Sequence, residues 1–323
     1  MSEPDRGVDT PPARLIALDW GTSALRAYLL GDDGAVLDTR SEAWGIMQLP
    51  SGGFPAAFEG VTDEWRRFAP GLPAIASGMV GSAQGWVEAP YCNAPAGSAE
   101  LAGALASAAD GRLFIVPGVV QDGGAPNVMR GEETQIVGAL AARPDLAERS
   151  LLVLPGTHSK WVGVADGRIR DFTTYMTGEL FAVLSSASIL GRFARDAGRD
   201  PTPESARDAF RRGVLASRSA QGGIAPLLFS ARSLVLTGRL APVASLEYLS
   251  GLLIGDEIRC GLTGGARPDT LIGDPALCER YQTAFGLFGV DAISVITDAA
   301  PVGLWTIAQH ASLAGPTSAA AIA

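Results

Sequence analysis

The sequence predicts an α/β protein made of two domains with similar architecture. The chain has 323 residues, which at about 150 residues per domain corresponds to two domains. An apolar strand, a Gly-Thr turn, a second strand and a hairpin occur around Gly21–Thr22 and again around Gly156–Thr157. Because the same order occurs twice at long separation, we expect a duplicated domain rather than a solenoid of short repeats.

The two predicted domains meet near residues 143–150. We expect residues 14–145 to form the first domain and residues 146–312 to form the second. Residues 1–13, which contain charges and end in prolines, are expected to be a disordered tail, and residues 313–323, which are rich in small side chains, a flexible one.

In the first half, apolar runs predict strands and apolar residues at helical spacing predict helices. The Gly and Asp residues at 31–34 tolerate positive φ, which predicts a hairpin turn there. The expected elements are a strand–turn–strand unit over 14–30, strands at 35–44 and 112–120, a strand leading into a glycine loop over 73–82, helices at 57–68, 98–109 and 133–142, and a loop over 121–134.

The second half begins with the same order of elements and then becomes more helical. Residues 150–172 predict a strand, a Gly-Thr turn, a strand, an Asp-Gly hairpin and a third strand. After them we expect helical segments at 178–195, 204–218 and 246–260, a strand at 234–239, and a strand, a Gly-Asp-Pro turn and a helix over 270–290.

Composition excludes several classes of protein. The formal net charge is −9 and basic residues are not clustered, so a nucleic-acid partner is not expected. With 47% hydrophobic and 18% charged residues the chain is globular. Its three cysteines (Cys92, Cys260 and Cys278) form no CxxC pair, and there are two histidines, so neither a disulfide scaffold nor a structural zinc site is expected.

The sequence also bears on the cellular compartment and the oligomeric state of the protein. The first 14 residues carry charge and proline where a signal peptide has an apolar run, and no apolar stretch of 18 residues occurs. We therefore expect a cytoplasmic protein without a membrane partner. A homodimer is expected because such assemblies are common among soluble proteins.

The two Gly-Thr turns suit a polyphosphate. Backbone N–H groups in such turns hold anionic oxygen atoms without a net charge. Asp19, before the first turn, can hold Mg²⁺ directly or through water, because hard cations prefer oxygen ligands. Lys160, beyond the second turn, is the only lysine among 25 basic residues and supplies a compact charge for phosphate. Two ordinary hairpins would carry similar turn residues, so neither turn is diagnostic alone.

Other phosphate motifs are missing from the sequence. There is no GxxxxGK[ST] segment, no GxGxxG after a strand, and no HRD and DFG pair. His158 and Ser159 are neighbours on a predicted strand and therefore point to opposite faces, which argues against a nucleophile–base pair.

The segment MRGEETQ carries two adjacent carboxylates, Glu132 and Glu133, at a junction between a loop and a helix. Phosphoryl transfer to an alcohol uses a carboxylate that accepts the hydroxyl proton and orients the oxygen. Only one of two neighbours is expected to face a ligand, and the other can stabilise the helix N-terminus. Two surface glutamates at a helix start would show the same pattern.

Five ordered segments resemble the 2-dehydro-3-deoxygalactonokinases, within the sugar kinase/actin/Hsp70 superfamily. They are LDWGTSALRAYL, ASGMVGSAQGWVEAPYCNAP, VPGVVQDGGAPNVMRGEETQ, LPGTHSKWV and LVLTGRLAPVASLEYLSGLLIGDEIR, which together run from about residue 15 to about residue 260. The resemblance implies two RNase-H-like domains with mixed β-sheets flanked by helices and a nucleotide cleft between them. It also implies phosphorylation of the 6-hydroxyl of 2-dehydro-3-deoxy-D-galactonate, with ATP and Mg²⁺.

The resemblance also assigns residues to roles. Glu132 takes the position of the catalytic carboxylate, with Glu133 as an alternative and Lys160 as a phosphate partner, and Asp19 lies near the metal. Pro155 stands where related kinases often have Asp or Gly, and Gly-Asp replaces a double glycine at the adenosine position, so both of these places depart from the family pattern. The residues implied to bind ATP are Asp19, Gly21, Thr22, Ser23, Gly156, Thr157, Ser159, Gly238, Gly273 and Asp274.

The substrate end must recognise a carboxylate and several hydroxyls. Arg26 and Arg130 are candidates for the carboxylate, since a guanidinium binds it through two hydrogen bonds. Core packing for the aromatic residues and a solvated strand face for Arg26 are the simpler alternatives. The remaining candidates are Ser77, Gly78, Met79, Trp86 and Tyr91. Other sugar or sugar-acid kinases, and ATPases or phosphohydrolases of the same superfamily, are the rival functions.

Overall fold

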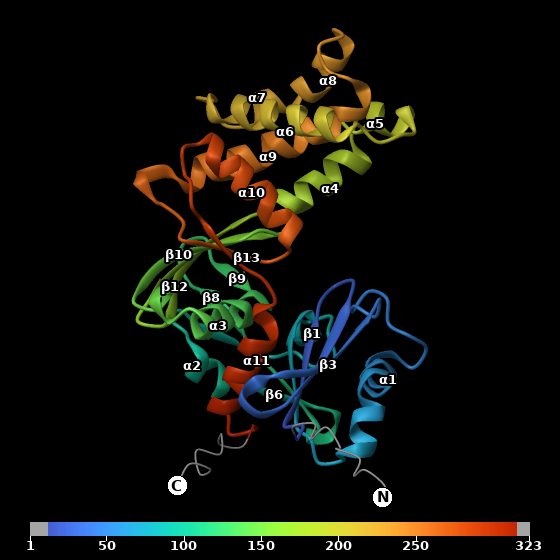
Figure 1. Ribbon diagram of the computed structural model, residues 1–323, viewed down its shortest axis with the longest axis vertical. Coiled ribbons are helices and arrows are strands. Elements are labelled where there is room, and N and C mark those ends of the chain that lie inside the picture. The colour runs from blue at the N-terminus through green and yellow to red at the C-terminus, as the bar shows by residue number, and fades with distance from the viewer. Residues whose placement is uncertain (1–11, 315–323) are drawn as a thin grey trace, which may run out of the picture. The chain divides into compact units, whose positions relative to one another are not determined.

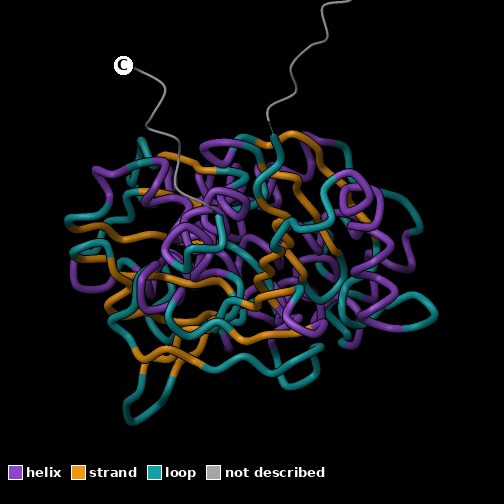
Figure 2. Tube along the Cα trace, turned by 90° about the horizontal axis from the view of Figure 1, so that it is seen from below, coloured by secondary structure: helices purple, strands orange, loops and turns teal. Residues whose placement is uncertain are grey.

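The structure, a computed structural model, describes residues 12–314. The chain contains both helices and strands (Figures 1 and 2), as the α/β prediction requires. The predicted tails fall outside the described residues, apart from residues 12, 13, 313 and 314. Within residues 12–314 the structure has no helix that is both long enough and apolar enough to span a bilayer.

The chain forms two compact units, and neither is continuous in sequence. Among the described residues, the first comprises 12–148, together with Ala165–Asp171 and 298–314. The second comprises Arg149–Val164 and Phe172–Thr297. The sequence prediction placed residues 146–312 in the second domain. The last helix, α11 (Ala299–His310), belongs instead to the first unit because it packs on α3 (Glu132–Ala142).

The first unit contains a mixed six-stranded sheet in the order β3-β2-β1-β4-β7-β6. Strand β1 pairs antiparallel with β2 and parallel with β4. Strands β5, β8 and β9 form a separate three-stranded sheet in the order β5-β8-β9. The strands are β1 (Leu15–Trp20), β2 (Leu25–Leu30), β3 (Val36–Glu42), β4 (Ala74–Gly78), β5 (Tyr91–Asn93), β6 (Ala106–Ala108), β7 (Leu113–Ile115), β8 (Gly118–Gln121) and β9 (Asn127–Met129).

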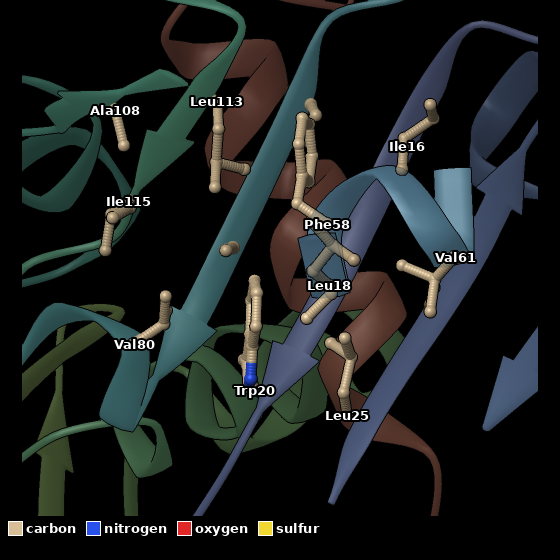
Figure 3. Packing of buried hydrophobic residues seen from close by; sticks show 14 of the residues in the cluster. Ile16, Leu18, Trp20, Leu25, Phe58, Val61, Val80, Ala108, Leu113 and Ile115 are labelled. Carbon is tan, nitrogen blue, oxygen red and sulfur yellow. The ribbon is translucent and has the colours of Figure 1, made fainter. Parts of the chain in front are cut away.

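The two faces of the large sheet are covered by different helices. Alternate residues of β1 lie on opposite faces. Leu18 and Trp20 belong to the cluster that also holds Phe58 of α1 (Gly53–Phe68), as Figure 3 shows. Helix α11 packs against β1, β4, α3 and α2 (Ser98–Ala102). Helix α11, from the last part of the described chain, therefore joins α3 to β1 and β4 of the sheet.

Helices α3 and α11 cross in backbone contact. A Cβ atom added to Gly138 would lie 2.0 Å from the carbonyl oxygen of Ala299. One added to Gly303 would lie 1.9 Å from the carbonyl oxygen of Thr134. No side chain fits at such distances, so both crossing positions require glycine.

The second unit has a five-stranded sheet in the order β12-β11-β10-β13-β14, in which β10, β13 and β14 are parallel. The hairpin of β10, β11 and β12 matches the predicted strand–turn–strand–hairpin order. These strands are β10 (Arg149–Leu154), β11 (Ser159–Ala165), β12 (Arg168–Tyr175), β13 (Thr270–Ile272) and β14 (Ser294–Ile296).

The rest of the second unit is helical. Helices α6 (Pro203–Arg218) and α9 (Ser245–Gly261) cross in backbone contact. A Cβ atom added to Gly213 would lie 2.2 Å from the carbonyl oxygen of Tyr248, and one added to Gly251 would lie 2.1 Å from the carbonyl oxygen of Phe210. Seven helices belong to this unit as described: α4 (Thr177–Ala187), α5 (Arg192–Ala197), α6 (Pro203–Arg218), α7 (Ala225–Leu228), α8 (Ser230–Leu236), α9 (Ser245–Gly261) and α10 (Pro275–Leu287).

Five sequence predictions of elements are wrong. The strand expected over 112–120 is divided into β7 and β8, which belong to different sheets. The helix expected over 178–195 is interrupted between α4 (Thr177–Ala187) and α5 (Arg192–Ala197). Residues 234–239 are not a strand but the end of α8 and the turn after it, because Leu234 and Val235 pack into an all-helical cluster with Leu249 and Leu252. The periodicity of a short apolar run does not distinguish a buried strand from a buried helix. The helix expected over 98–109 ends at Ala102 and is followed by β6, which pairs with β7. The expected loop over 121–134 contains β9.

We predict that Gly303→Ala destabilises the protein by about 3 kcal/mol, the upper end of the usual cost of overpacking, because the new methyl group must separate α3 from α11. Thermal and urea unfolding measure this loss. The matched control is Gly286→Ala in α10, where the nearest atom would be 3.7 Å away and helix propensity favours alanine by up to about 1 kcal/mol. Equal stability of the two variants would contradict the prediction.

Candidate active site

In the first unit, Asp19 lies near the end of β1, beside the first Gly-Thr turn. Its cross-strand partner is Arg26 on β2, and Ser77 lies opposite it on β4. Burial raises the pKa of Asp19, and the charge of Arg26 opposes that rise. Burial also raises the pKa of Tyr28, and the charges of Asp19 and of Asp298, which precedes α11, act in the same direction. Asp19 therefore belongs to a compact polar cluster.

The first Gly-Thr turn is held through its carbonyl oxygens and leaves backbone N–H groups exposed. The carbonyl oxygens of Gly21 and Thr22 accept hydrogen bonds from Ile46 and Met47 at 3.1 and 3.2 Å. Thr22 and Ser23 are exposed, and their N–H groups have no protein acceptor among residues 12–314. Such groups suit an anionic oxygen from a ligand.

The loops after β4 and before α3 meet at two glycines. Gly78 and Gly131 have φ values of 97° and 107°, which favour glycine. A Cβ on Gly131 would lie 3.3 Å from the Cα of Gly78. This close approach brings the buried Ser77 near the segment that carries Glu132. Ser77, Gly78 and Glu132, which the sequence analysis predicted as site residues, are therefore near one another.

The two adjacent glutamates differ in environment. Glu133 is fully buried, and its carboxylate accepts hydrogen bonds from the Gly131 N–H group at 2.7 and 2.9 Å and from the Thr134 hydroxyl at 3.1 Å. Burial, with the neighbouring charge of Glu132, raises the pKa of Glu133 to about 7. Glu132 is only half-buried, and one oxygen accepts the Arg130 N–H group at 3.0 Å. Of the two, Glu132 is the one that solvent reaches.

The candidate substrate residues fall into two groups. Arg130 donates to the carbonyl oxygen of Ala89 at 2.8 Å and stacks over Tyr91 at 4.3 Å. Its Nε and Nη1 atoms are buried and have no hydrogen-bond partner among residues 12–314. Such atoms have hydrogen-bonding capacity to spare. Trp86, in contrast, stacks on Phe54 with ring centroids 6.0 Å apart and is packed against the core. The core alternative thus describes Trp86 better. Arg26 is exposed and Met79 is half-buried.

The second unit has a cavity of about 540 Å³ next to the second Gly-Thr turn. Gly156, Thr157 and Asp274, which the resemblance assigns to ATP binding, line it. Asp274 also caps α10 by accepting the Leu277 N–H group at 2.9 Å. The other lining residues are Pro155, Thr177, Gly178, Phe181, Glu247, Ser250, Leu253, Ile254, Leu277, Arg280 and Tyr281.

Three predicted ATP-binding residues of the second unit are not part of the cavity lining. Gly238 was placed at a strand end, but it follows the helix α8 and is not in the lining. Ser159 is fully buried, and its hydroxyl donates to Glu257 at 2.6 Å. The predicted Gly273 precedes the lining residue Asp274, and its Cβ position would lie 3.7 Å from the oxygen of Pro155.

The residues beyond the second turn behave as strand alternation predicts. His158 contacts Glu179 at 2.5 Å, whereas Ser159 points to the interior, so the two do not form a pair. Lys160 is 3% exposed, and its ammonium group donates to the carbonyl oxygen of His158 at 2.9 Å. The only lysine is therefore held close to the turn.

Sequence reasoning missed Glu257, which is buried on α9 and accepts four hydrogen bonds. It also missed Thr177 and Arg280 in the cavity wall. The available signal was a carboxylate on α9 that has the apolar Leu253 and Ile254 at helical spacing before it. A charge on a buried helix face needs partners.

Comparisons with known proteins agree over nearly the whole chain. Residues 19–307 match the family model described as 2-keto-3-deoxy-galactonokinase. The 2-dehydro-3-deoxygalactonokinase of Escherichia coli (strain K12) is 40% identical over 301 residues, which cover 92% of this chain and 98% of that protein. A solved structure of a protein assigned as a 2-dehydro-3-deoxygalactonokinase, from Sinorhizobium meliloti, superposes with a TM-score of 0.82 at 37% identity and covers 91% of this chain and 98% of that one.

We predict that Glu133→Gln changes the pH dependence of stability. The pKa of Glu133 rises from 4.5 to about 7 on folding, so the folded protein holds this proton more tightly than the unfolded chain does. The wild type therefore loses stability relative to the variant as the pH rises from about 4.5 through about 7, by about 3 kcal/mol in all. Urea unfolding of both proteins at several pH values measures it. A difference that stays constant with pH would contradict it.

Proposed function

The chain belongs to the 2-keto-3-deoxy-galactonokinase family, and from that premise we propose that it transfers the γ-phosphoryl group of ATP to the 6-hydroxyl of 2-dehydro-3-deoxy-D-galactonate. The observation that carries the proposal beyond the family is the cavity of about 540 Å³ at the Gly156–Thr157 turn. This cavity joins a turn with backbone donors to an apolar wall, as a nucleotide requires.

The second unit supplies the nucleotide site in this proposal. Phe181, Leu253, Ile254 and Leu277 offer the apolar surface for a base. The N–H groups of the Gly156–Thr157 turn face the phosphates. Lys160 adds a positive charge near that turn, where it neutralises charge that develops during transfer. Asp274 and Gly273 border the sugar side of the nucleotide.

The first unit supplies the acceptor side. Glu132 is the proposed base, because its carboxylate is half-buried and reachable, whereas Glu133 is enclosed and bonded to its own turn. Glu132 orients the substrate hydroxyl and accepts its proton as the oxygen attacks the γ-phosphorus. Arg26 and Arg130 are proposed to bind the carboxylate, with Ser77, Gly78, Met79 and Tyr91 around the chain of the substrate.

Mg²⁺ fits the donor set near the first turn. Among residues 12–314 no three His, Cys, Asp or Glu side chains gather as a metal cage. Mg²⁺ bound with ATP normally takes one or two carboxylates and fills its other positions with phosphate oxygens and water. Asp19, next to the turn, is the carboxylate proposed to hold it, and Gly21, Thr22 and Ser23 border the same place. When bound, the ion neutralises phosphate charge.

The proposal is tested by an ADP-release assay with ATP, Mg²⁺ and 2-dehydro-3-deoxy-D-galactonate. Parallel reactions contain the gluconate epimer, other sugar acids, or no acid. Release of ADP that depends on the galactonate, together with a 6-phosphate ester in the product, supports the proposal. Preference for another acid would make the chain a different sugar-acid kinase, and ADP release without any acid would indicate an ATPase or phosphohydrolase.

We predict that Glu132→Gln lowers kcat by about a hundredfold or more, the usual contribution of a general base, and leaves nucleotide binding intact. Steady-state kinetics and calorimetric titration with ADP measure the two effects. The matched control is Glu42→Gln, a neutralised glutamate on the exposed edge strand β3. Near-normal turnover of Glu132→Gln would exclude Glu132 as the base and leave Glu133 as the candidate.

A further inference from the structure

Glu257 is a buried carboxylate with a complete set of donors. Its side chain on α9 is 2% exposed. One oxygen accepts the Ser159 hydroxyl and the Trp161 indole N–H group, and the other accepts the hydroxyls of Thr177 and Tyr281. The four distances are between 2.5 and 2.9 Å. No other part of the proposed function uses this carboxylate.

Burying this group is costly unless its partners are in place. A carboxylate loses its hydration in the interior, and hydrogen bonds from fixed donors offset that loss. Burial accordingly raises the pKa of Glu257, and the four donors oppose the rise by favouring the anion. Removing one donor leaves a buried acceptor under-satisfied, which is more costly than the mean value of a hydrogen bond. The position of each donor is thus tightly specified.

The four donors come from three elements that border the nucleotide cavity. Ser159 and Trp161 begin β11 just after the Gly156–Thr157 turn. Thr177 begins α4 and Tyr281 lies on α10, and both line the cavity.

The start of α4 also contacts the turn directly. The Glu179 N–H group donates to the carbonyl oxygen of Thr157 at 3.0 Å. A Cβ on Gly178 would lie 2.6 Å from the oxygen of Gly156. A shift of α4 would therefore move the turn, and the bond between Thr177 and Glu257 restrains that shift.

We propose that Glu257 is a positioning residue that sets the geometry of the nucleotide pocket by tying β11, α4 and α10 to α9. This inference rests on the proposed function, because it takes the cavity to be the ATP site. Glu257 touches no part of the nucleotide itself. Its loss raises KM for ATP, while KM for the sugar acid changes little. A merely structural role would lower stability and leave both constants of the folded enzyme unchanged.

Four variants separate these outcomes. Tyr281→Phe and Thr177→Val each remove one donor with little change in volume, and Glu257→Gln keeps the shape but replaces one acceptor oxygen with a donor. The Trp161 N–H group can only donate, so the glutamine oxygen must face Trp161 and its NH₂ group must face Thr177 and Tyr281. The matched control is Tyr248→Phe, which removes another buried hydroxyl, bonded to Ser230 at 3.0 Å, outside the cavity lining.

The measurements are calorimetric titration with ADP, KM for ATP and for the acid, kcat, and the melting temperature. We expect Glu257→Gln, Tyr281→Phe and Thr177→Val to weaken ADP binding and raise KM for ATP about tenfold, the effect of one lost hydrogen bond to a charged group. Tyr248→Phe is expected to lower the melting temperature without changing ADP binding.

Unchanged ADP binding in Tyr281→Phe and Thr177→Val, at a temperature where both are folded, would overturn the inference even if Glu257→Gln does not fold. An equal rise in KM for ATP in Tyr248→Phe would also overturn it. Wild-type protein that binds no ADP would instead refute the nucleotide site, and with it the proposed function.

Discussion

Contact between helix backbones at glycine positions is the constraint on which both units depend. In the first unit Gly138 and Gly303 let α3 and α11 touch, and in the second Gly213 and Gly251 do the same for α6 and α9. The two helices at each crossing cannot shift toward each other, because main-chain atoms in contact have no alternative rotamers as side chains do. The start of α3, with Glu132, and the position of Glu257 on α9 are therefore set by main-chain geometry.

The two buried carboxylates illustrate different ways to hold a charge in the interior. Glu133 depends on its own turn, since its partners are Gly131 and Thr134. Its pKa of about 7 shows that these local partners compensate burial only in part. Glu257 collects donors from three distant segments. The hydrogen bonds of Glu133 stabilise a single loop, whereas those of Glu257 fix the positions of several elements relative to each other.

Much of the fold follows from local patterns in the sequence. The repeated strand–Gly-Thr–strand order, the helix of Glu132 and Glu133, and the strand and helix around Asp274 all reflect alternation, helical spacing and turn residues. Gly238 was misplaced because the apolar run just before it, 234–236, is compatible with either a strand or a helix. The packing of Leu234 and Val235 against a cluster from other helices favours the helix. Glu257 was missed because its four partners lie up to 98 residues away in sequence, and no local pattern records such contacts.

The interleaving of the units along the chain constrains the order of folding during synthesis. The first unit takes its last helix, α11, from residues that follow the whole second unit. A ribosome therefore releases β1, β4 and α3 long before the helix that packs on them exists. Until then the apolar face of that layer must stay exposed or be shielded by a chaperone. A nascent chain stalled before Asp298 should accordingly be sensitive to protease in its first half, even though that half is fully synthesised.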